Sequence, residues 1–411
     1  MSQTVADRDS YGIFSADAVQ NPYPHYRAMR EREPIHWSEK ARAWYFTRYR
    51  DVFDLQDRPD LSVDRIETLY SYLPRVNPER FSDIVDHYHR WLLYRDDTYH
   101  DRLKALFLKA MTPRAVERLR PMVQRRVDAI IDTLAERGAF DAYLDYAARL
   151  PTQVMLDLLD LPDSDELMLR HWSDRCSNFL FQPVSPDKGA MAQEQREILD
   201  AQQAYFMPLI EERRRNPGAD DMISAMARAE VDGEQLTDLE ILATCNMMAT
   251  AGGGTSRSAI AMSLWWLHKF PDQLAKLKAD PTLVDSAAEE FLRSDAPTQR
   301  GIRTAREDFE IGGVRIRKGQ ILHIMIGAAN RDPDQFSDPD RLDISRNPNR
   351  HVTLGHGVHY CLGAALARLE LRVAVASFLD RFPNYRPASD QIVFMDRTAS
   401  RRPTSVPVFA R

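Results

Sequence analysis

One long apolar segment constrains this chain more than any other feature of its sequence. From Gln235 to Phe270 it reads QLTDLEILATCNMMATAGGGTSRSAIAMSLWWLHKF. Thr237, with Glu240 three residues later, predicts a capping box at the start of a helix, and Phe270-Pro271 predicts its end near Lys269. Such a helix is about 50 Å long at 1.5 Å per residue. A helix so long and so apolar has to cross the middle of the fold.

The rest of the chain also reads as mainly helical. Helical patterns cover residues 98–137, 151–181 and 190–215; a short helix begins at Asn21, another helix ends near Ser294, and the last runs from about Leu362 to Arg381. PIHWSEKARAWYFTR predicts a β-hairpin, and DFEIGGVRIRKGQILHI predicts a small sheet with a turn at Gly312-Gly313. No linker is evident. We therefore expect one domain over residues 1–411, mainly α with a minor β-sheet (α+β).

Composition and charge exclude several classes of protein. The 411 residues are 44% hydrophobic, which is enough for a large buried core. A net charge of −6 argues against a general nucleic-acid binder. The three widely spaced cysteines predict no disulfide framework and a reducing, cytoplasmic compartment. The first residues, MSQTVADRDS, lack an apolar leader segment, and no run approaches the roughly 18 apolar residues that span a bilayer. We expect no membrane anchor.

A single cysteine near the C-terminus lies among glycines and histidines, in LGHGVHYCLG from Leu354 to Gly363. Glycines permit tight turns and close approach to a flat ligand, and the helix that starts after Cys361 favours a thiolate. Three functional roles compete with that of a buried structural cysteine: a haem iron ligand, a zinc ligand with His356 and His359, and a catalytic nucleophile. Structural zinc sites usually include a second, distant Cys/His pair, and this sequence has none. The sequence also lacks the local signature of a thiol enzyme. The three glycines and the helix start favour the haem thiolate.

Two other motifs gain meaning from their order along the chain. In EEFLR, Glu290 and Arg293 share one helix face and can pair, as such residues do on many solvated helices. In ATAGGGT, each glycine from Gly252 to Gly254 costs about 1 kcal/mol in a helix interior. This cost indicates a close approach or a kink, or else a break between two helices. The hydroxyl of Thr255 can bond a carbonyl one turn back or a ligand.

A glycine-rich mid-helix segment ending in Thr, then Glu-x-x-Arg, then Gly-x-Gly-x-His-x-Cys-x-Gly resembles the cytochrome P-450 family. The resemblance spans nearly the whole chain, from NPYPHYRAMR to RRPTSVPV, and is nearest to soluble bacterial members. It implies the fold of that family and a haem b cofactor. It also implies that Cys361 is the proximal thiolate ligand of the iron, which favours O–O cleavage.

The same resemblance assigns roles to residues outside the cysteine loop. It implies that the haem propionates are bound by His100, Lys104, Arg303, His351 and His359. Because His100 and Lys104 are four residues apart, they lie on one helix face, where one carboxylate can contact both. A helix face that is exposed to solvent can show the same spacing. The resemblance makes Glu290 and Arg293 a buried structural pair with Arg341 as third member. It makes Thr255 part of proton delivery, whereas Gly254 stands where the family usually has Asp or Glu. Leu354 replaces a common Phe, and Lys104 a common Arg.

The implied function is a haem-thiolate monooxygenase that inserts oxygen from O2 into a small-to-medium organic substrate of secondary metabolism. The chain carries no flavin, nicotinamide or iron–sulfur motif, so electrons are expected from a ferredoxin or flavodoxin with an NAD(P)H reductase. The basic stretch 114–126 either docks this donor or is a solvated face. Family matching places the pocket walls at residues 61–92, 176–186, 245–255, 296–302 and 392–400. Gly254 leaves open a redirected reaction (C–N bond formation, nitrene, nitric oxide or peroxide chemistry), and a non-catalytic haem sensor or carrier is a further alternative.

Overall fold

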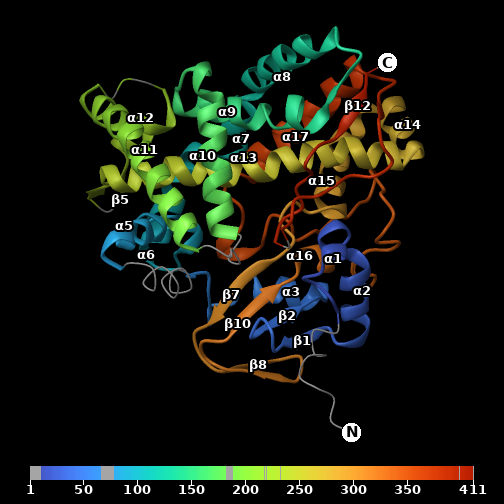
Figure 1. Cartoon of the computed structure of the whole chain (residues 1–411), viewed down its shortest axis with the longest axis horizontal. Coiled ribbons are helices and arrows are strands. Elements are labelled where there is room, and N and C mark those ends of the chain that lie inside the picture. Colours follow the sequence, from blue (N-terminus) through green and yellow to red (C-terminus); the bar gives the residue numbers. More distant parts are fainter. Residues whose placement is uncertain are drawn as a thin grey trace.

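A computed structural model describes residues 11–65, 78–181, 188–216, 218, 220–231, 233–397 and 399–410. Helices make up most of it (Figure 1). Those from the N-terminal half are α1 (Ala16–Gln20), α2 (Tyr23–Arg32), α3 (Tyr49–Leu55), α5 (Pro78–His89), α6 (Thr98–Ala110), α7 (Pro113–Glu117), α8 (Arg120–Ala135), α9 (Leu150–Leu159), α10 (Glu166–Phe181) and α11 (Lys188–Arg215). Those from the C-terminal half are α12 (Met222–Arg228), α13 (Asp238–Lys269), α14 (Pro271–Ala279), α15 (Val284–Ser294), α16 (Ile326–Ala329) and α17 (Ala364–Arg381).

The long helix of the sequence is α13, and its predicted ends are confirmed. Thr237 is the N-cap, and its side chain and that of Glu240 bond each other's backbone N–H groups in a capping box. The helix ends at Lys269, with Phe270 as C-cap ahead of Pro271. It runs across the helical half of the molecule, with α10, α9, α11 and α17 packed along it (Figure 1). The glycines do not break it.

Two of the expected helical segments are divided where proline occurs. Residues 98–137 form α6, α7 and α8, and residues 151–181 form α9 and α10. Pro113 lies in the first turn of α7 and Pro121 in that of α8. Proline has no N–H to donate to the preceding turn, so it begins helices more readily than it continues them.

A five-stranded sheet lies below α13 in Figure 1, beside α2 and α3, and joins distant parts of the chain. Its order is β1 (Ile35–Ser38), β2 (Ala43–Phe46), β10 (Ile321–Ile324), β7 (Gly301–Ala305), β3 (Leu61–Ser62). The predicted hairpin is confirmed as β1 and β2, with Ile35 opposite Phe46. β10 runs parallel to β2, with Ile321 opposite Ala43, and antiparallel to β7. This sheet holds the residues just before and within β7 in place.

Of the three strands predicted around Gly312-Gly313, only two pair with each other. β8 (Phe309–Ile311) and β9 (Val314–Ile316) form a hairpin whose turn glycines have φ of +57° and +79°, as a tight turn of this kind requires. The third predicted strand is β10, which pairs with β2 and β7 instead. The remaining strands are β4 (Ala139–Asp141), β11 (Arg386–Pro387) and β12 (Pro407–Phe409) in one sheet, and β5 (Glu230–Val231) with β6 (Glu234–Gln235) in another.

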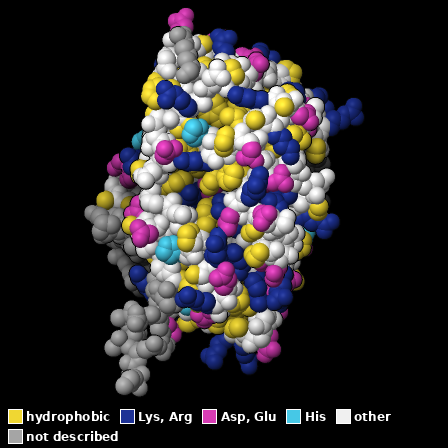
Figure 2. Space-filling model, turned by 90° about the vertical axis from the view of Figure 1, so that its right-hand side faces the viewer, with side chains coloured by type: hydrophobic (Ala, Val, Ile, Leu, Met, Phe, Trp, Pro, Cys, Tyr) yellow, Lys and Arg dark blue, Asp and Glu magenta, His cyan; other side chains and the backbone are white. Residues whose placement is uncertain are grey.

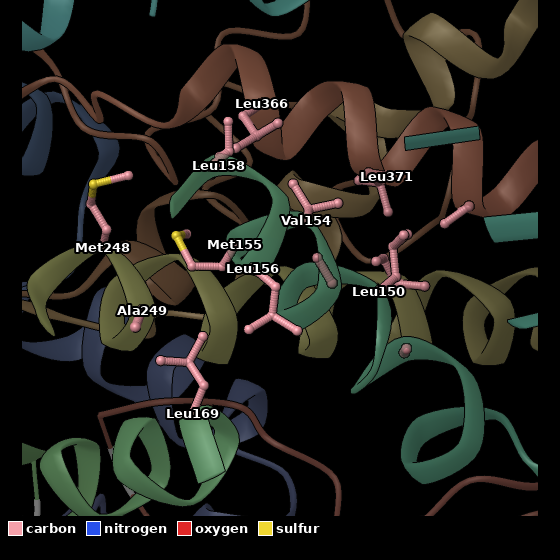
Figure 3. Close-up of a cluster of buried hydrophobic side chains, with 14 of the residues drawn as sticks. Leu150, Val154, Met155, Leu156, Leu158, Leu169, Met248, Ala249, Leu366 and Leu371 are labelled. Carbon is pink, nitrogen blue, oxygen red and sulfur yellow. The ribbon is translucent and has the colours of Figure 1, made fainter. Parts of the chain in front are cut away.

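The main core surrounds α13 (Figure 3). Met248 and Ala249 of α13, Met155 and Leu158 of α9, and Leu366 of α17 belong to one buried hydrophobic cluster. Burial of such side chains contributes roughly 1.5–3 kcal/mol each. The mainly α architecture with minor sheets is the predicted fold class.

The surface shows no separation of charge on the face that carries α2 and α14. Acidic and basic side chains are intermingled there (Figure 2), in keeping with the small net charge. Within the ranges that the structure describes, no helix combines the length and apolar character that a membrane crossing needs.

Candidate functional site

The cysteine loop is held in a fixed shape before α17. Its backbone turns at Gly355 and Gly357, whose φ angles are +78° and +69°. A β-carbon on Gly357 would lie 1.6 Å from Oδ1 of Asp57, the same oxygen that accepts the N–H of Val358 at 3.0 Å. The N–H of Cys361 donates to the carbonyl of Leu354 at 2.8 Å. Asp57 and the glycines together fix where the cysteine lies, and only glycine fits at position 357.

The thiol of Cys361 sits just before the N-terminus of α17, as expected, but its surroundings do not by themselves favour a thiolate. Burial raises the pKa of the Cys361 thiol, and the backbone N–H of Gly363 and the charge of Arg368 lower it only partly. The start of α17 therefore lowers the pKa of the thiol by less than burial raises it. A cation bonded to the sulfur is what favours the thiolate in such a site.

The zinc alternative is not supported by the arrangement of the histidines. The ring of His356 stacks on Phe53, with ring centroids 4.0 Å apart. His359 has a different partner, with Nε2 3.0 Å from Oδ1 of Asp96. Among the described residues, no group of three or more His, Cys, Asp and Glu side chains is placed to hold a metal ion. A single sulfur is the protein ligand that this loop offers.

Three of the predicted propionate residues come together beside this loop. The rings of His100 and His359 are 4.7 Å apart, and the ammonium of Lys104 donates to the carbonyl of Val358. His100 is 1% exposed, and its Nε2 is buried without a hydrogen-bond partner. Burial lowers the pKa of His100. A buried ring nitrogen with no partner is costly unless a bound group supplies one, which fits a cofactor that carries carboxylates.

Arg303, the fourth predicted residue, is a half-buried cation that forms no ion pair with an acidic residue of the described chain. Its guanidinium donates to the carbonyl of Ile302 at 3.0 Å. Burial, and then repulsion from Arg65, lower its pKa to about 10. The nearby carboxylate of Asp96 is already bonded by His359, Ser62 and Arg306. A guanidinium held this way favours an incoming anion. These residues thus fit the propionates of haem.

His351 lies in a different network. Its Nε2 is 3.2 Å from Oε2 of Glu289, and its Nδ1 accepts the N–H of Thr353. Arg368 bonds both oxygens of Glu289, at 2.6 and 2.9 Å, and also donates to the hydroxyl of Tyr360 beside Cys361. Both ring nitrogens of His351 are therefore engaged, and no contact joins it to His100, Lys104, Arg303 or His359.

The glycine run in α13 coincides with an exposed stretch of an otherwise buried helix. Ala251 and Thr255, one turn apart, are exposed, while the helix on either side of them is buried. A β-carbon on Gly252 would make a tight contact of 3.2 Å with Cε of Met155, whereas one on Gly253 would lie at an ordinary 3.5 Å from Oγ of Ser173. Close approach of α9 therefore accounts for Gly252, and the helix continues through the run without a break. The hydroxyl of Thr255 donates to the carbonyl of Ala251 at 2.9 Å, which leaves its lone pairs free for a ligand.

The exposed stretch of α13 lies next to the start of α17. Leu366 of α17 packs in the cluster that contains Met248 of α13 (Figure 3). One turn further on, the buried carboxyl of Glu370 is bonded to the hydroxyl of Ser256, the residue after Thr255. α17 therefore packs against α13, and the bond of Glu370 ties the helix that follows Cys361 to the segment that carries Thr255.

The space beside Gly254 is taken by a cation that no sequence motif predicts. A β-carbon at 254 would lie 3.8 Å from Nη2 of Arg257. That guanidinium is paired with Asp174 of α10, and Arg402 bonds the same carboxylate oxygen at 2.8 Å. Where the family usually has an acid on this helix, the chain has an arginine that holds an acid from the neighbouring helix. No motif in the sequence marks Asp174.

The Glu290–Arg293 pair forms as predicted, but its third member is different. Both side chains are fully buried, and Nε and Nη2 of Arg293 bond the two oxygens of Glu290 at 2.7 and 2.8 Å. The third cation is Arg346, whose Nε lies 3.2 Å from Glu290. The expectation for Arg341 was wrong: only its carbonyl accepts from Arg293, and its side chain pairs with Asp272 at the surface. The chain turns between the two arginines, so Arg346 reaches the buried carboxylate.

The basic stretch 114–126 retains part of its predicted charge. Arg120 pairs with Glu117, and Arg126 pairs with Asp157 and Asp163. The other three arginines, Arg114, Arg118 and Arg125, are exposed and form no ion pair within the described residues. α7, which carries Arg114, packs against α17. Of the predicted pocket walls, residues 66–77, 182–186 and 398 lie outside the described ranges.

Comparisons with known proteins agree with this site. The family model described as Cytochrome P450 matches residues 75–404. Cytochrome P450 107B1 of Saccharopolyspora erythraea is 36% identical over 380 residues, which cover 90% of each chain. P450BioI, solved in complex with hexadec-9Z-enoic acid ligated acyl carrier protein, has a TM-score of 0.88 at 31% identity over 96% of this chain and 99% of that one. Myxobacterial CYP267B1 in complex with myristic acid has a TM-score of 0.86 at 33% identity, over 97% and 98%. This chain belongs to the cytochrome P450 family of haem monooxygenases.

Proposed function

We propose that this monooxygenase inserts one oxygen atom from O2 into an amphipathic organic substrate of small to medium size, in secondary metabolism. The observation that carries the proposal is the exposed stretch Ala251–Thr255 of α13, and we place the substrate cleft between it and the cysteine loop. It opens in the middle of a helix that is otherwise buried, which is where a substrate can reach a cofactor bound at Cys361. We take residues 1–411 as one domain around this cleft.

Haem b is the cofactor that we assign to the site, and its chemistry when bound is the activation of O2. In this proposal Cys361 supplies the iron ligand through Sγ. His100, Lys104, Arg303 and His359 neutralise the propionates. His351 remains a candidate, although it would have to exchange a present partner for a propionate. Holding the cofactor by both its metal and its acidic edge fixes it against the cleft.

Thr255 is the residue that we place nearest the reacting atoms. Its hydroxyl hydrogen is held by the carbonyl of Ala251, so its oxygen is oriented to accept a hydrogen bond from a ligand in the cleft. Proton delivery past Gly254 then involves water and groups from other elements, because no carboxylate is attached at this position of α13.

Electrons come, in this proposal, from a ferredoxin or flavodoxin with an NAD(P)H reductase. The exposed arginines Arg114, Arg118 and Arg125 offer an acidic carrier three unpaired cations on and beside α7. Because α7 packs against α17, the carrier would dock on the cysteine side.

The substrate class follows from the cleft walls and from two relatives. Met155, Met248 and Ala249 make the wall beside the glycine run apolar. P450BioI and CYP267B1 were solved with a fatty acyl group on a carrier protein and with myristic acid. An acyl chain with a polar end is therefore the substrate class that we propose for this chain.

The test has two steps that separate cofactor from reaction. The reduced, carbon monoxide-bound absorption spectrum reports thiolate ligation, and the Cys361→Ser variant is its control. Turnover with a surrogate ferredoxin system under isotopically labelled O2 should then give a product that contains one labelled oxygen atom. Product without the label would contradict monooxygenation.

A second candidate is a redirected reaction on the same haem: C–N bond formation, nitrene, nitric oxide or peroxide chemistry. The observation that favours it is the guanidinium of Arg257 beside Gly254, where an acid is usual in the family. Turnover with peroxide in place of O2 and reductant, at a comparable rate, would select this candidate.

A further inference from the structure

A group of half-buried cations near β7 has more positive charge than the proposed cofactor can neutralise. Arg65, Arg300 and Arg303 belong to it: burial, and then repulsion from Arg65, lower the pKa of Arg300 and that of Arg303. His323 of β10 lies in the same group: burial, and then Arg300 and Arg65, hold its pKa well below the ordinary value.

The guanidinium groups of Arg65 and Arg300 have no acceptor. Neither forms an ion pair or a hydrogen bond within the described residues, and the Nε of each is buried without a partner. Their contacts are with aromatic rings: Arg300 lies 5.6 Å from the ring centre of Phe14, and Arg65 lies 5.1 Å from that of Tyr94. Rings give a cation only partial compensation for lost water. Two half-buried guanidiniums whose Nε atoms are buried without an acceptor are therefore costly unless a ligand supplies an anion.

The cofactor accounts for only part of this charge. Haem brings two carboxylates, and His100, Lys104, Arg303 and His359 already surround the place proposed for them. The nearby carboxylate, Asp96, is bonded by His359, Ser62, Arg306 and the N–H of Val63. Within the part of the chain that the structure describes, Arg65 and Arg300 remain without a counter-ion when these pairings are complete.

Buried aromatic rings connect these arginines with α13. The ring of Tyr94, over which Arg65 lies, stacks with Trp91 at 6.4 Å, Trp91 contacts Tyr88 at 4.9 Å, and Tyr88 stacks on Phe179 at 5.6 Å. His87, the residue before Tyr88, bonds Asn246 of α13 at 3.3 Å. A ligand with its charged end at Arg65 and Arg300 would therefore lie beside an apolar cluster that reaches α13, which suits an apolar chain.

We propose that Arg300 and Arg65 form a binding site for the free carboxylate of the substrate, so that the enzyme selects carboxylic acids with an apolar chain. This inference rests on the proposed function and narrows its substrate class. An acyl chain held in a thioester on a carrier protein has no free carboxylate and would not use the site. The acid and its ester are therefore the pair of ligands that tests it.

The experiment measures binding in the haem-loaded enzyme, without turnover. Dissociation constants for myristic acid and methyl myristate are obtained by calorimetry and from the shift of the haem absorption band. We expect the wild type to bind the acid about tenfold or more tightly than the ester, as a charged hydrogen-bonded pair allows. Arg300→Gln and Arg65→Gln should each weaken acid binding by a similar factor and change ester binding less than about twofold. Arg300→Lys should restore part of the preference.

A control variant and a measurement of haem content distinguish loss of the carboxylate site from general effects on charge or on the cofactor. Arg317→Gln removes one exposed positive charge on the turn before β10 and should leave both dissociation constants unchanged. Equal binding of acid and ester by the wild type, or equal weakening of both by Arg300→Gln, would overturn the proposal. So would loss of haem from Arg300→Gln in proportion to the lost binding, since Arg300 would then serve the cofactor. Failure of the monooxygenase assignment would appear separately, in the labelled-oxygen experiment.

Discussion

Glu370 makes the stability of this enzyme depend on pH in a direction opposite to that of most acidic residues. The side chain lies on α17, is 3% exposed and has the hydroxyl of Ser256 as its partner. Burial raises its pKa from the ordinary value of 4.5 to about 8, and the hydrogen bond from Ser256 lowers it only partly. The folded protein therefore keeps a proton on Glu370 at neutral pH that the unfolded chain has lost.

The sign and size of the effect follow from this difference. Between about pH 4.5 and pH 8 the folded state binds more protons at Glu370 than the unfolded state does, so its contribution to the free energy of unfolding falls as pH rises. The contribution is fully present below the unfolded-state pKa of 4.5 and is lost as pH rises through the folded-state pKa of about 8. At about 1.4 kcal/mol for each pKa unit, the total loss is roughly 5 kcal/mol, of which roughly 4 kcal/mol falls between about pH 5 and about pH 9.

Glu370→Gln tests this, because the amide keeps the shape and the hydrogen bond but cannot ionise. The free energy of unfolding of the haem-loaded protein is measured by urea titration at several values from about pH 5 to about pH 9. Relative to the wild type, the variant should gain roughly 4 kcal/mol over that range. Glu310→Gln, at an exposed position of β8, should show no such trend. A stability difference for Glu370→Gln that stays constant with pH, or falls, would refute the reasoning.

Three further predictions concern the cysteine loop and the buried network. Arg346→Leu, which leaves a buried carboxylate short of one cation, should lower the free energy of unfolding by roughly 3 kcal/mol or more in urea titration; Arg341→Leu, at an exposed pair, should lower it by about 1 kcal/mol or less. Gly357→Ala should reduce haem content, because a β-carbon there collides with the carboxylate that fixes the loop. Gly313→Ala, also at positive φ but with no atom nearby, should leave haem content unchanged and measures backbone strain alone. Cys361→Ser should lose the absorption band of the reduced, carbon monoxide-bound thiolate form while far-ultraviolet circular dichroism still reports a helical protein.

Local signals predicted the parts of this fold that depend on neighbouring residues. The ends of α13 followed from Thr237, Glu240 and Pro271, because a capping box and a proline act within one turn. The turn between β8 and β9 was predicted from Gly312 and Gly313, because glycines permit the positive φ angles of a tight turn. The partner of β10 was not, because pairing with β2 depends on packing between segments far apart in the sequence.

The site divides in the same way. Cys361 and Thr255 could be found from motifs, because a thiolate loop and a glycine-rich helix need particular residue types in a fixed order. Arg346, Asp174 and Glu370 could not, since each acts through a contact across helices that no spacing reveals. For Cys361 itself, position was predictable and ionisation was not, because burial outweighs the effect of the helix start.

The parallel pairing of β2 with β10 has a consequence for how this enzyme is made. During synthesis β2 emerges early, while the strand that covers its open edge, with Ile321 opposite Ala43, leaves the ribosome only after three quarters of the chain. Until then the hairpin exposes unpaired backbone groups that other nascent chains can join. Any fragment that stops before Ile321 would keep this strand edge unpaired and exposed. Premature termination should therefore yield insoluble material rather than a smaller folded unit.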